Sequence, residues 1–592
     1  MFKKVQFVFG ILLVLSMLLT ACGPTATEAP AAEEPTAEAP AAEETAVEEP
    51  TQEAATMPEV SDLVLLVTPG GQSLTTFTKN FNPFTGSPLF PTLSGMYEPM
   101  MIYNKITGEI VPWLATGYEW SEDNLNLTFT LRDGVSWSDG EPLTTDDVVF
   151  TFNTLKNVAE ASGPAKAIVG ENGYISEVTA DGNTVSFTFN QVFIPAFYDI
   201  ILQVIVPAHI WSGVEDIATF TNDTPVATGP FTEVVDFKDQ VYEVDRNPNY
   251  WQEGKPYFKG LRMPAFSGND AAANMFVNGD TEIGGQFIAN REDTVLSKNE
   301  NVNCWWPTVT FQVLFITNTT KAPFDDPIMR KSIGMAFDRV KLIDIALQGG
   351  SVPTDLTGMN DAYAKYKVTD LSILGDNWVT YDPDTANQWL DEAGYAIGTD
   401  GYRTNKDGSP MELEMIEVNG FTDWLAVAPL MKQELEAIGL NVVMNTYDAA
   451  VAFDKWFKGD FDMSLSFGNL GTPTLYAWMS NAMSESTVKP VGEATTFGVN
   501  PWRFSDPAAE PWLEVLATNP DEEAQLEAAV ELQKLFAQDA PFIPMWSQPT
   551  FLCYSTARFT GFPSADNPYV ATSPGVSNQP ETLILLTTIH AK

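Results

Sequence analysis

The chain has 592 residues and a formal net charge of −47 at pH 7, from 78 acidic and 31 basic side chains. This length exceeds what one hydrophobic core can organise, so two or more lobes are expected. Such a negative charge repels phosphate backbones and argues against nucleic acid as a partner. The two histidines, His209 and His590, are too few and too scattered for a zinc site or a Ser-His-Asp arrangement. We therefore expect no catalytic triad, and we expect no metal and no other cofactor.

The N-terminus has the pattern of an export signal. Lys3 and Lys4 precede an apolar run over residues 5–19, which is too short for a comfortable membrane span. Small residues then lead to Cys22, as in a bacterial lipoprotein signal. We expect residues 1–21 to be removed and Cys22 to carry the lipid that anchors the protein to the cell membrane, facing the periplasm or the cell exterior. The alternatives are an ordinary secretory signal with a chance cysteine, or an uncleaved anchor.

Residues 22–60 are expected to form a tether. The segment consists mostly of Ala, Glu, Pro and Thr, with nine glutamates between Glu28 and Glu53 and no basic residue in that stretch. It cannot bury enough apolar surface to offset its ordering entropy. An extended, self-repelling spacer is therefore favoured over a metal-binding or partner-binding tail.

The most informative stretch covers residues 112–155. Alternating apolar residues over 125–131 predict a half-buried strand. Two turns that contain Asp-Gly follow, and the periodicity then becomes helical. Thr144 or Thr145 can cap that helix, which carries two aspartates in its first turn.

This stretch resembles the signature region of a known family. Its motifs WLA, RDGVSWSDG and DDV begin at Trp113, Arg132 and Asp146. They are similar to motifs of the extracellular solute-binding proteins that serve ABC importers, of the large oligopeptide, dipeptide, nickel and oligosaccharide type. The alternative is a hairpin and a helix in an unrelated secreted α/β protein. Further matches extend the resemblance over essentially the whole chain after residue 60: FNPF from Phe81, TGPF from Thr228, RNPNYW from Arg246, PFDD from Pro323, YDPDTANQWLDEAGY from Tyr381 and APFIPMW from Ala540.

Other elements are read from periodicity and from the same resemblance. Residues 94–103 resemble a family helix, and Asp384 is expected to cap the helix that Gly394 ends. Strands are expected over 63–67, 183–190, 311–318, 411–416 and 441–446, and further helices over 424–438 and 526–536.

The resemblance implies an α/β fold of the type II periplasmic-binding-protein kind, with two lobes, a hinge and an extra subdomain in lobe one. By analogy lobe one covers 61–100, 225–310 and 546–592, the inserted subdomain 101–224, and lobe two 311–545. Closure about the hinge would bury the solute. The family implies no reaction; the loaded protein, expected to be a monomer, docks on the transmembrane permease subunits of an ABC transporter.

The ligand class depends on a loop of lobe two. Peptide-binding relatives hold the peptide ammonium with an aspartate after a lobe-two strand, whereas the corresponding residues 465–479 carry no charge. A buried ammonium without a carboxylate partner would cost several kcal/mol. The loop instead offers neutral hydrogen-bonding groups and aromatic faces, which suit an oligosaccharide. The segment 420–424 also resembles one in the oligosaccharide-binding branch. The expected ligand-binding residues are Asn82, Trp424, Asn469, Tyr476 and Trp478.

Two other functions stay open. An oligopeptide or dipeptide could still bind if Asp423 or Asp462 held its amine. A secreted glycoside hydrolase is a distant alternative, because carboxylates abound but no nucleophile or metal motif organises them. The sequence also leaves open whether Cys304 and Cys553 pair or remain free.

Overall fold

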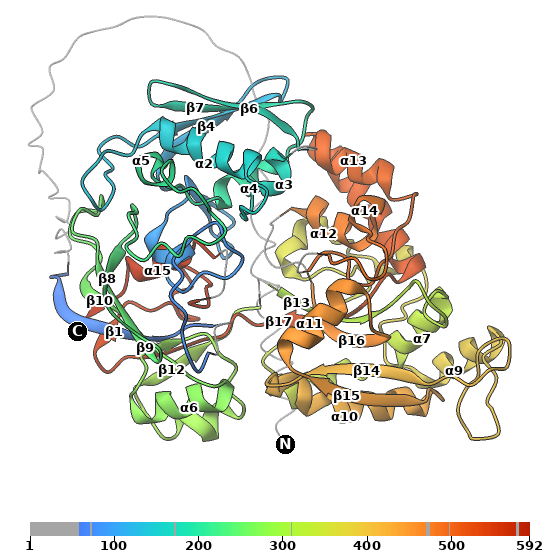
Figure 1. Cartoon of the computed structure of the whole chain (residues 1–592). Coiled ribbons are helices and arrows are strands. Elements are labelled where there is room, and N and C mark those ends of the chain that lie inside the picture. The colour runs from blue at the N-terminus through green and yellow to red at the C-terminus, as the bar shows by residue number, and fades with distance from the viewer. Residues whose placement is uncertain are drawn as a thin grey trace, which may run out of the picture. The chain divides into compact units, whose positions relative to one another are not determined.

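The computed structural model describes residues 58–70, 74–170, 173–308, 311–468, 474–495, 498–575 and 579–592 (Figure 1). Within these residues, helices flank three sheets of four to seven strands. The expected α/β class is therefore confirmed. We call the seven-stranded sheet and its surroundings the first lobe, the four-stranded sheet with its helices the inserted subdomain, and the five-stranded sheet with its helices the second lobe.

The first lobe is built on a sheet with the order β12-β18-β11-β1-β10-β9-β8. Its strands are β1 (Ser61–Thr68), β8 (Phe231–Lys238), β9 (Val241–Arg246), β10 (Phe258–Pro264), β11 (Ile283–Gly284), β12 (Val302–Trp305) and β18 (Leu552–Ser555). The central strand β1 pairs in parallel with β10 and β11, and its Leu65 and Val67 are fully buried. The smaller elements of this lobe are η1 (Thr92–Met96), β2 (Met101–Tyr103), β3 (Ile110–Pro112), α6 (Asn269–Asn278), η2 (Glu292–Leu296), β19 (Phe559–Thr560), α15 (Thr582–Leu586) and β20 (His590–Ala591).

The inserted subdomain contains the sheet β4-β5-β7-β6. Its elements are β4 (Ala115–Trp120), β5 (Asn126–Leu131), α2 (Thr145–Asn157), α3 (Lys166–Val169), β6 (Ile175–Asp181), β7 (Thr184–Phe189), α4 (Ala196–Leu202) and α5 (Ala208–Trp211). The alternation expected for β5 is confirmed, because Leu127, Phe129 and Leu131 are its buried residues. Thr144 rather than Thr145 precedes α2, and its backbone N–H donates to the Asp147 carboxylate at 2.8 Å. The Thr144 side chain in turn accepts from the backbone N–H of Asp147, and this capping box fixes the start of the helix.

The second lobe contains the sheet β15-β14-β16-β13-β17. Its strands are β13 (Phe311–Thr317), β14 (Leu413–Val418), β15 (Val442–Tyr447), β16 (Met463–Phe467) and β17 (Ile543–Gln548), and its α-helices are α7 (Pro327–Ala336), α8 (Arg339–Leu347), α9 (Pro383–Glu392), α10 (Thr422–Ala437), α11 (Ala449–Lys458), α12 (Leu475–Met483), α13 (Glu510–Thr518) and α14 (Glu522–Asp539). Short helices are η3 (Asp361–Tyr366), η4 (Leu371–Leu374) and η5 (Glu485–Thr487). Strands β14 and β15 pair in parallel, and α10 connects them.

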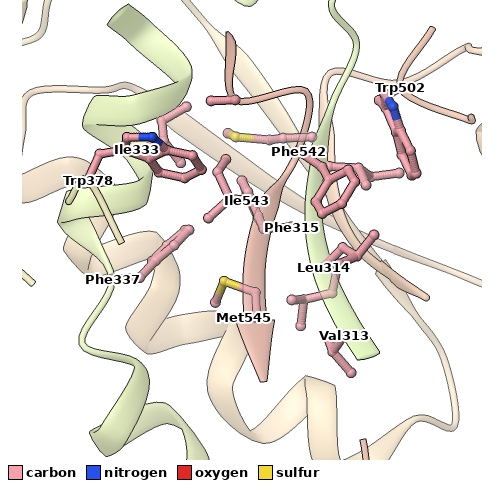
Figure 2. Close-up of a cluster of buried hydrophobic side chains, with 14 of the residues drawn as sticks. Val313, Leu314, Phe315, Ile333, Phe337, Trp378, Trp502, Phe542, Ile543 and Met545 are labelled. Atoms are coloured by element: carbon pink, nitrogen blue, oxygen red, sulfur yellow. The ribbon is translucent and has the colours of Figure 1, made fainter. Parts of the chain in front are cut away.

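The core of the second lobe lies along β13 and β17. Figure 2 shows Phe315, Ile543 and Met545 of these strands among side chains from the covering segments, including Ile333 and Trp378. All five are buried. β13 and the edge strand β17 therefore hold the helices of this lobe together by packing.

The two lobes are connected by two segments that run side by side. The chain passes from β12 to β13 and returns from β17 to β18, and β12 pairs with β18 in the first lobe. Cys304 and Cys553 are directly opposite in that pair and form a disulfide, with their Cα atoms 4.1 Å apart. β17 continues to Gln548, so the expected lobe boundary at 546 falls inside this strand.

Two local expectations are wrong. Residues 94–103 do not form one helix: η1 ends at Met96 and β2 begins at Met101. Pro99 lies between them, and a proline removes a helical N–H and clashes with the preceding turn. The cap of α9 is Asp382, whose carboxylate accepts from Thr385 N–H at 3.0 Å. Asp384 is already inside the helix because Pro383 occupies its first position.

We predict that the disulfide contributes strongly to stability, because it joins residues separated by 249 positions in the sequence. In the chain-entropy account a loop this long stabilises the folded state by about 5–6 kcal/mol. The Cys304→Ser/Cys553→Ser double variant should therefore unfold at lower urea concentration than the parent. Adding reductant should lower the urea midpoint of the parent to that of the variant and leave the midpoint of the variant unchanged. Equal midpoints for oxidised parent and variant would contradict the prediction.

A candidate ligand site between the lobes

The carboxyl ends of β14, β16 and β17 lie at one edge of the second-lobe sheet. β14 is parallel to β16, and both β16 and β17 are antiparallel to β13. In open α/β sheets, ligands bind outside the carboxyl ends of the strands. The same edge leads into the segment that returns to the first lobe after Gln548. We call it the carboxyl edge and take it as one side of the candidate site.

Trp478 lies beneath this edge. Its side chain is 3% exposed and packs against Phe542, with ring centroids 5.6 Å apart, and against Tyr363 at 6.1 Å. A Cβ atom added at Gly468 would lie 2.6 Å from the indole, so this glycine gives Trp478 its place under the end of β16. The indole N–H is buried and meets no acceptor among the described residues. Asn469 and the next four residues lie outside the part of the chain that the structure describes.

Trp424 packs at the start of α10. It is 1% exposed, and its ring lies 4.8 Å from Phe467 and 5.3 Å from Phe421. This position couples the first turn of α10 to the end of β16. The indole therefore supports the carboxyl edge by packing beneath it.

Asn82 lies in the first lobe and is fully buried. Its amide group donates to the carbonyls of Ile217 and Phe220, at 2.7 and 2.8 Å. Its carbonyl oxygen accepts from Phe84 N–H at 2.8 Å. Both amide protons are thus used to hold one loop of the first lobe against another.

Tyr476 contacts the inserted subdomain. It is partly buried on α12, and its ring meets Phe193 edge-on with centroids 5.3 Å apart. Burial is the largest cause that raises the pKa of Tyr476 well above its usual value. Tyr476, one of the five residues expected to bind ligand, therefore makes a ring contact between the second lobe and the inserted subdomain.

A group of tyrosines from both lobes was not expected from the sequence. Tyr103 of the first lobe and Tyr198 of α4 in the inserted subdomain meet edge-on, with ring centroids 5.6 Å apart. Burial, and then the nearby Tyr103 and Tyr366, raise the pKa of Tyr198 to about 12. Burial and the nearby Tyr103 also raise the pKa of Tyr363. Tyr103 thus lies within electrostatic range of Tyr198, Tyr363 and Tyr366, and Tyr198 lies within range of Tyr366. We call these four residues the tyrosine cluster.

The sequence held a weak signal for this cluster. Tyr363 and Tyr366 are three residues apart in the short, kinked helix η3. Tyr103 and Tyr198 belong to segments that adjoin only in the fold, through the contact of α4 with β2. No sequence spacing relates them, so reasoning along the chain missed them.

The two acids considered for an amine occupy different places. Asp462 precedes β16, at the end opposite the carboxyl edge, and pairs with Lys321 at 2.5 Å. That position removes Asp462 from the candidate site. Asp423 lies in the first turn of α10, at the carboxyl edge, and is 7% exposed. Burial raises the pKa of Asp423 to about 6, although hydrogen bonds that include Gln548 partly offset the rise.

The comparisons with known proteins define the class of protein. A periplasmic oligopeptide-binding protein of Thermotoga maritima has a similar structure, with 25% identity, a TM-score of 0.81, and coverage of 89% of this chain and 99% of that one. A crystal structure of the same protein described as mannohexaose-bound matches with a TM-score of 0.79, again at 25% identity, over 90% of this chain and 99% of that chain. These neighbours confirm the type II-like periplasmic-binding fold.

Residues 109–489 match the family described as "Bacterial extracellular solute-binding proteins, family 5 Middle". The chain therefore belongs to family 5 of the bacterial extracellular solute-binding proteins. The glutathione-binding protein GsiB of Escherichia coli K12 is 27% identical over 462 residues, which cover 76% of this chain and 82% of GsiB. The nickel-binding periplasmic protein of the same organism is 25% identical over 383 residues, or 62% of this chain and 69% of that protein.

Membership of the family establishes the general role. Proteins of this family bind solutes for ABC importers and are not enzymes, and they work outside the cytoplasm with permease subunits. In the ranges that the structure describes, no helix is both long and apolar enough to cross a membrane.

Glu417, the next-to-last residue of β14, makes the stability of the site region depend on pH. Its side chain is fully buried and neither carboxyl oxygen has a hydrogen-bond partner among the described residues. Burial raises the pKa of Glu417 to about 8. Its folded pKa lies above its unfolded value, so its contribution to stability is complete below about pH 4 and is lost as the pH rises through about 8.

We predict that Glu417→Gln flattens this pH dependence. From pH 5 to pH 8 the parent should lose on the order of 1–3 kcal/mol relative to the variant, because the variant has no proton to release. Urea unfolding at pH 5 and pH 8 measures the free energy of unfolding of both proteins. The other buried acids are the same in both, so their contributions cancel when the parent is compared with the variant. Glu414→Gln is the matched control, since Glu414 lies on the same strand but accepts hydrogen bonds from Asn445 and Tyr447. Parallel pH profiles for the parent and Glu417→Gln would refute the assignment.

Proposed function

We propose that the chain is a lipid-anchored receptor that captures an oligosaccharide between its two lobes and delivers it to the permease of an ABC importer. The tyrosine cluster is the observation that carries this proposal. A solute between the lobes would meet aromatic side chains from both of them. Sugars suit such a site, because their C–H faces stack on rings and their hydroxyls pair with phenol groups.

Two further observations support a sugar. The stretch from residue 465 to 479 has no ionisable side chain except Tyr476, and so offers no carboxylate for a peptide ammonium. The structural neighbour from Thermotoga maritima has been described with mannohexaose bound. In this proposal Trp478 supports Tyr363 from below, Trp424 supports the carboxyl edge, and Asn469 remains a proposed partner for sugar hydroxyls.

A peptide is the second candidate, favoured by Asp423. This carboxyl group lies at the carboxyl edge, where an ammonium group of a bound peptide could pair with it. Several relatives are named for peptide-like ligands, including the glutathione-binding proteins and an oligopeptide-binding protein of Bacillus subtilis with a nonapeptide. Peptide binding that is lost on acetylation of the peptide amine would favour this candidate over the sugar.

We predict that Tyr366→Ala weakens binding of mannohexaose about tenfold or more. Loss of an aromatic platform costs roughly 1–3 kcal/mol, and each 1.4 kcal/mol is about a factor of ten. Calorimetric titration measures the change, and Tyr366→Phe separates the ring from the hydroxyl. Tyr381→Ala is the control, because Tyr381 lies in the same lobe but is not part of the tyrosine cluster, and its side chain is 49% exposed. Equal affinities for the parent and Tyr366→Ala would remove Tyr366 from the site.

The choice between sugar and peptide is tested first with the parent protein. Because a ligand that binds only the folded state raises apparent stability, melting curves should shift upward with mannohexaose or related oligosaccharides. A shift with free-amine peptides and none with the sugars would overturn the oligosaccharide proposal. The role as a solute receptor would stand in that case.

Lipid anchoring rests on Cys22, which lies outside the described residues. We predict that Cys22→Ser releases the protein from the membrane fraction or blocks removal of the signal peptide, because no thiol is left to accept lipid. Cell fractionation and mass spectrometry of the mature N-terminus measure both effects. Unchanged processing and membrane retention of the variant would show that the anchor is not at Cys22.

A further inference from the structure

The loop that joins β7 to α4, residues 190–195, extends from the inserted subdomain to the second lobe. Phe193 is at its centre and is only 6% exposed. One face of its ring stacks on Tyr174 of the same subdomain, with centroids 3.7 Å apart and planes 5° apart. Its edge meets Tyr476 of α12 at 5.3 Å and 86°. Phe193 is thus held between a ring of its own subdomain and a ring of the other lobe.

A backbone hydrogen bond lies beside this ring contact. Ile194 N–H donates to the carbonyl of Ala517 at 2.9 Å. Ala517 belongs to the last turn of α13, and its methyl group is buried together with apolar side chains of the first lobe. Figure 1 shows α13 next to the inserted subdomain. The loop is therefore joined to two helices of the second lobe, at α12 by aromatic packing and at α13 by a hydrogen bond.

These contacts are separate from the segments that connect the lobes. The connecting segments leave β12 and β17 and hold the sheets together covalently. The loop contacts involve α12 and α13, which no disulfide ties to the first lobe. Rotation of the lobes about the connecting segments would separate Phe193 from Tyr476 and break the bond to Ala517.

Separation would expose apolar surface on both sides. Phe193 would lose the cover that Tyr476 provides, and the Ala517 side chain would leave its apolar neighbours. The hydrophobic effect opposes that exposure whether or not a solute is present. Edge-to-face aromatic pairs add a geometric preference to the burial.

We propose that residues 190–195 form a latch that holds the lobes closed before the solute binds. Part of the free energy of closure is then built into the protein and is not supplied by the ligand. The apparent affinity for any solute scales with the fraction of protein in the binding-competent form. Because the latch increases the fraction of closed protein, it raises the affinity without contacting the solute. It also slows release, because the latch must open before a bound solute can leave. Tyr476 acts here as a residue of the latch.

The test is small-angle X-ray scattering of the solute-free protein. Phe193→Ala removes the central ring and should increase the radius of gyration relative to the parent. Tyr476→Ala attacks the same contact from the other lobe and should give the same increase. Trp120→Ala is the matched control, because Trp120 packs on Phe189 within the inserted subdomain, at 5.3 Å, and should leave the radius unchanged.

Each outcome decides the proposal. An increase in both latch variants and none in the control supports it. No increase in either latch variant overturns it, and so does an equal increase in Trp120→Ala, which would report a loosened subdomain. If mannohexaose binds the parent, Phe193→Ala should also release it about three to ten times faster in stopped-flow measurements. The scattering result needs no ligand, so failure of the oligosaccharide proposal and failure of the latch can be told apart.

Discussion

The paired segments that connect the two sheets are the constraint on which the rest of the structure depends. β12 and β18 lie side by side in the first lobe, and the chain leaves one and returns to the other. Cys304 and Cys553 fix these two strands at the place where they adjoin the connecting segments. Because both segments start from one fixed pair, any movement of the second lobe must occur about them. In the proposed function, movement of whole lobes and not of a local loop would enclose the solute.

This constraint explains why aromatic side chains collect between the lobes. Surfaces that face one another across a hinge are buried in one arrangement and exposed in another, so they must tolerate water and also pack well. Tyrosine meets both needs, since its ring packs and its hydroxyl hydrogen-bonds. Tyr103 and Tyr198 on one side and Tyr366 on the other have this character. Phe193, by contrast, has no polar atom, and its burial therefore favours the closed arrangement more strongly.

The buried acids show how the same fold limits what it can bind. Asp462 is neutralised by Lys321 at the far end of β16, whereas Asp423 and Glu417 lie near the carboxyl edge without a cationic partner in the described residues. Burial raises the pKa of both, so each is held closer to its neutral form than an exposed carboxyl group. A site bordered by such groups suits neutral solutes, and Asp423 is the group through which it could also accept a cation.

The sequence by itself determined the α/β class, the family and most of the local elements. Periodicity alone identified β5 and α10, because burial of one face repeats every two residues in a strand and about every 3.6 in a helix. Motif order identified the solute-binding family. Two local expectations were wrong, a helix interrupted by Pro99 and a cap displaced by Pro383, because local stereochemistry overrides the pattern there.

Only the tertiary structure decided where the aromatic residues lie and which cysteines pair. A tryptophan looks the same in sequence whether it lines a site or supports one, and Trp424 and Trp478 are both buried beneath the carboxyl edge. Tyr198 and Tyr366 are brought near each other by the arrangement of two lobes, which no spacing along the chain encodes. Cys304 and Cys553 pair because β12 and β18 are neighbours in one sheet. Contacts between residues hundreds of positions apart depend on packing, and packing is a property of the whole fold.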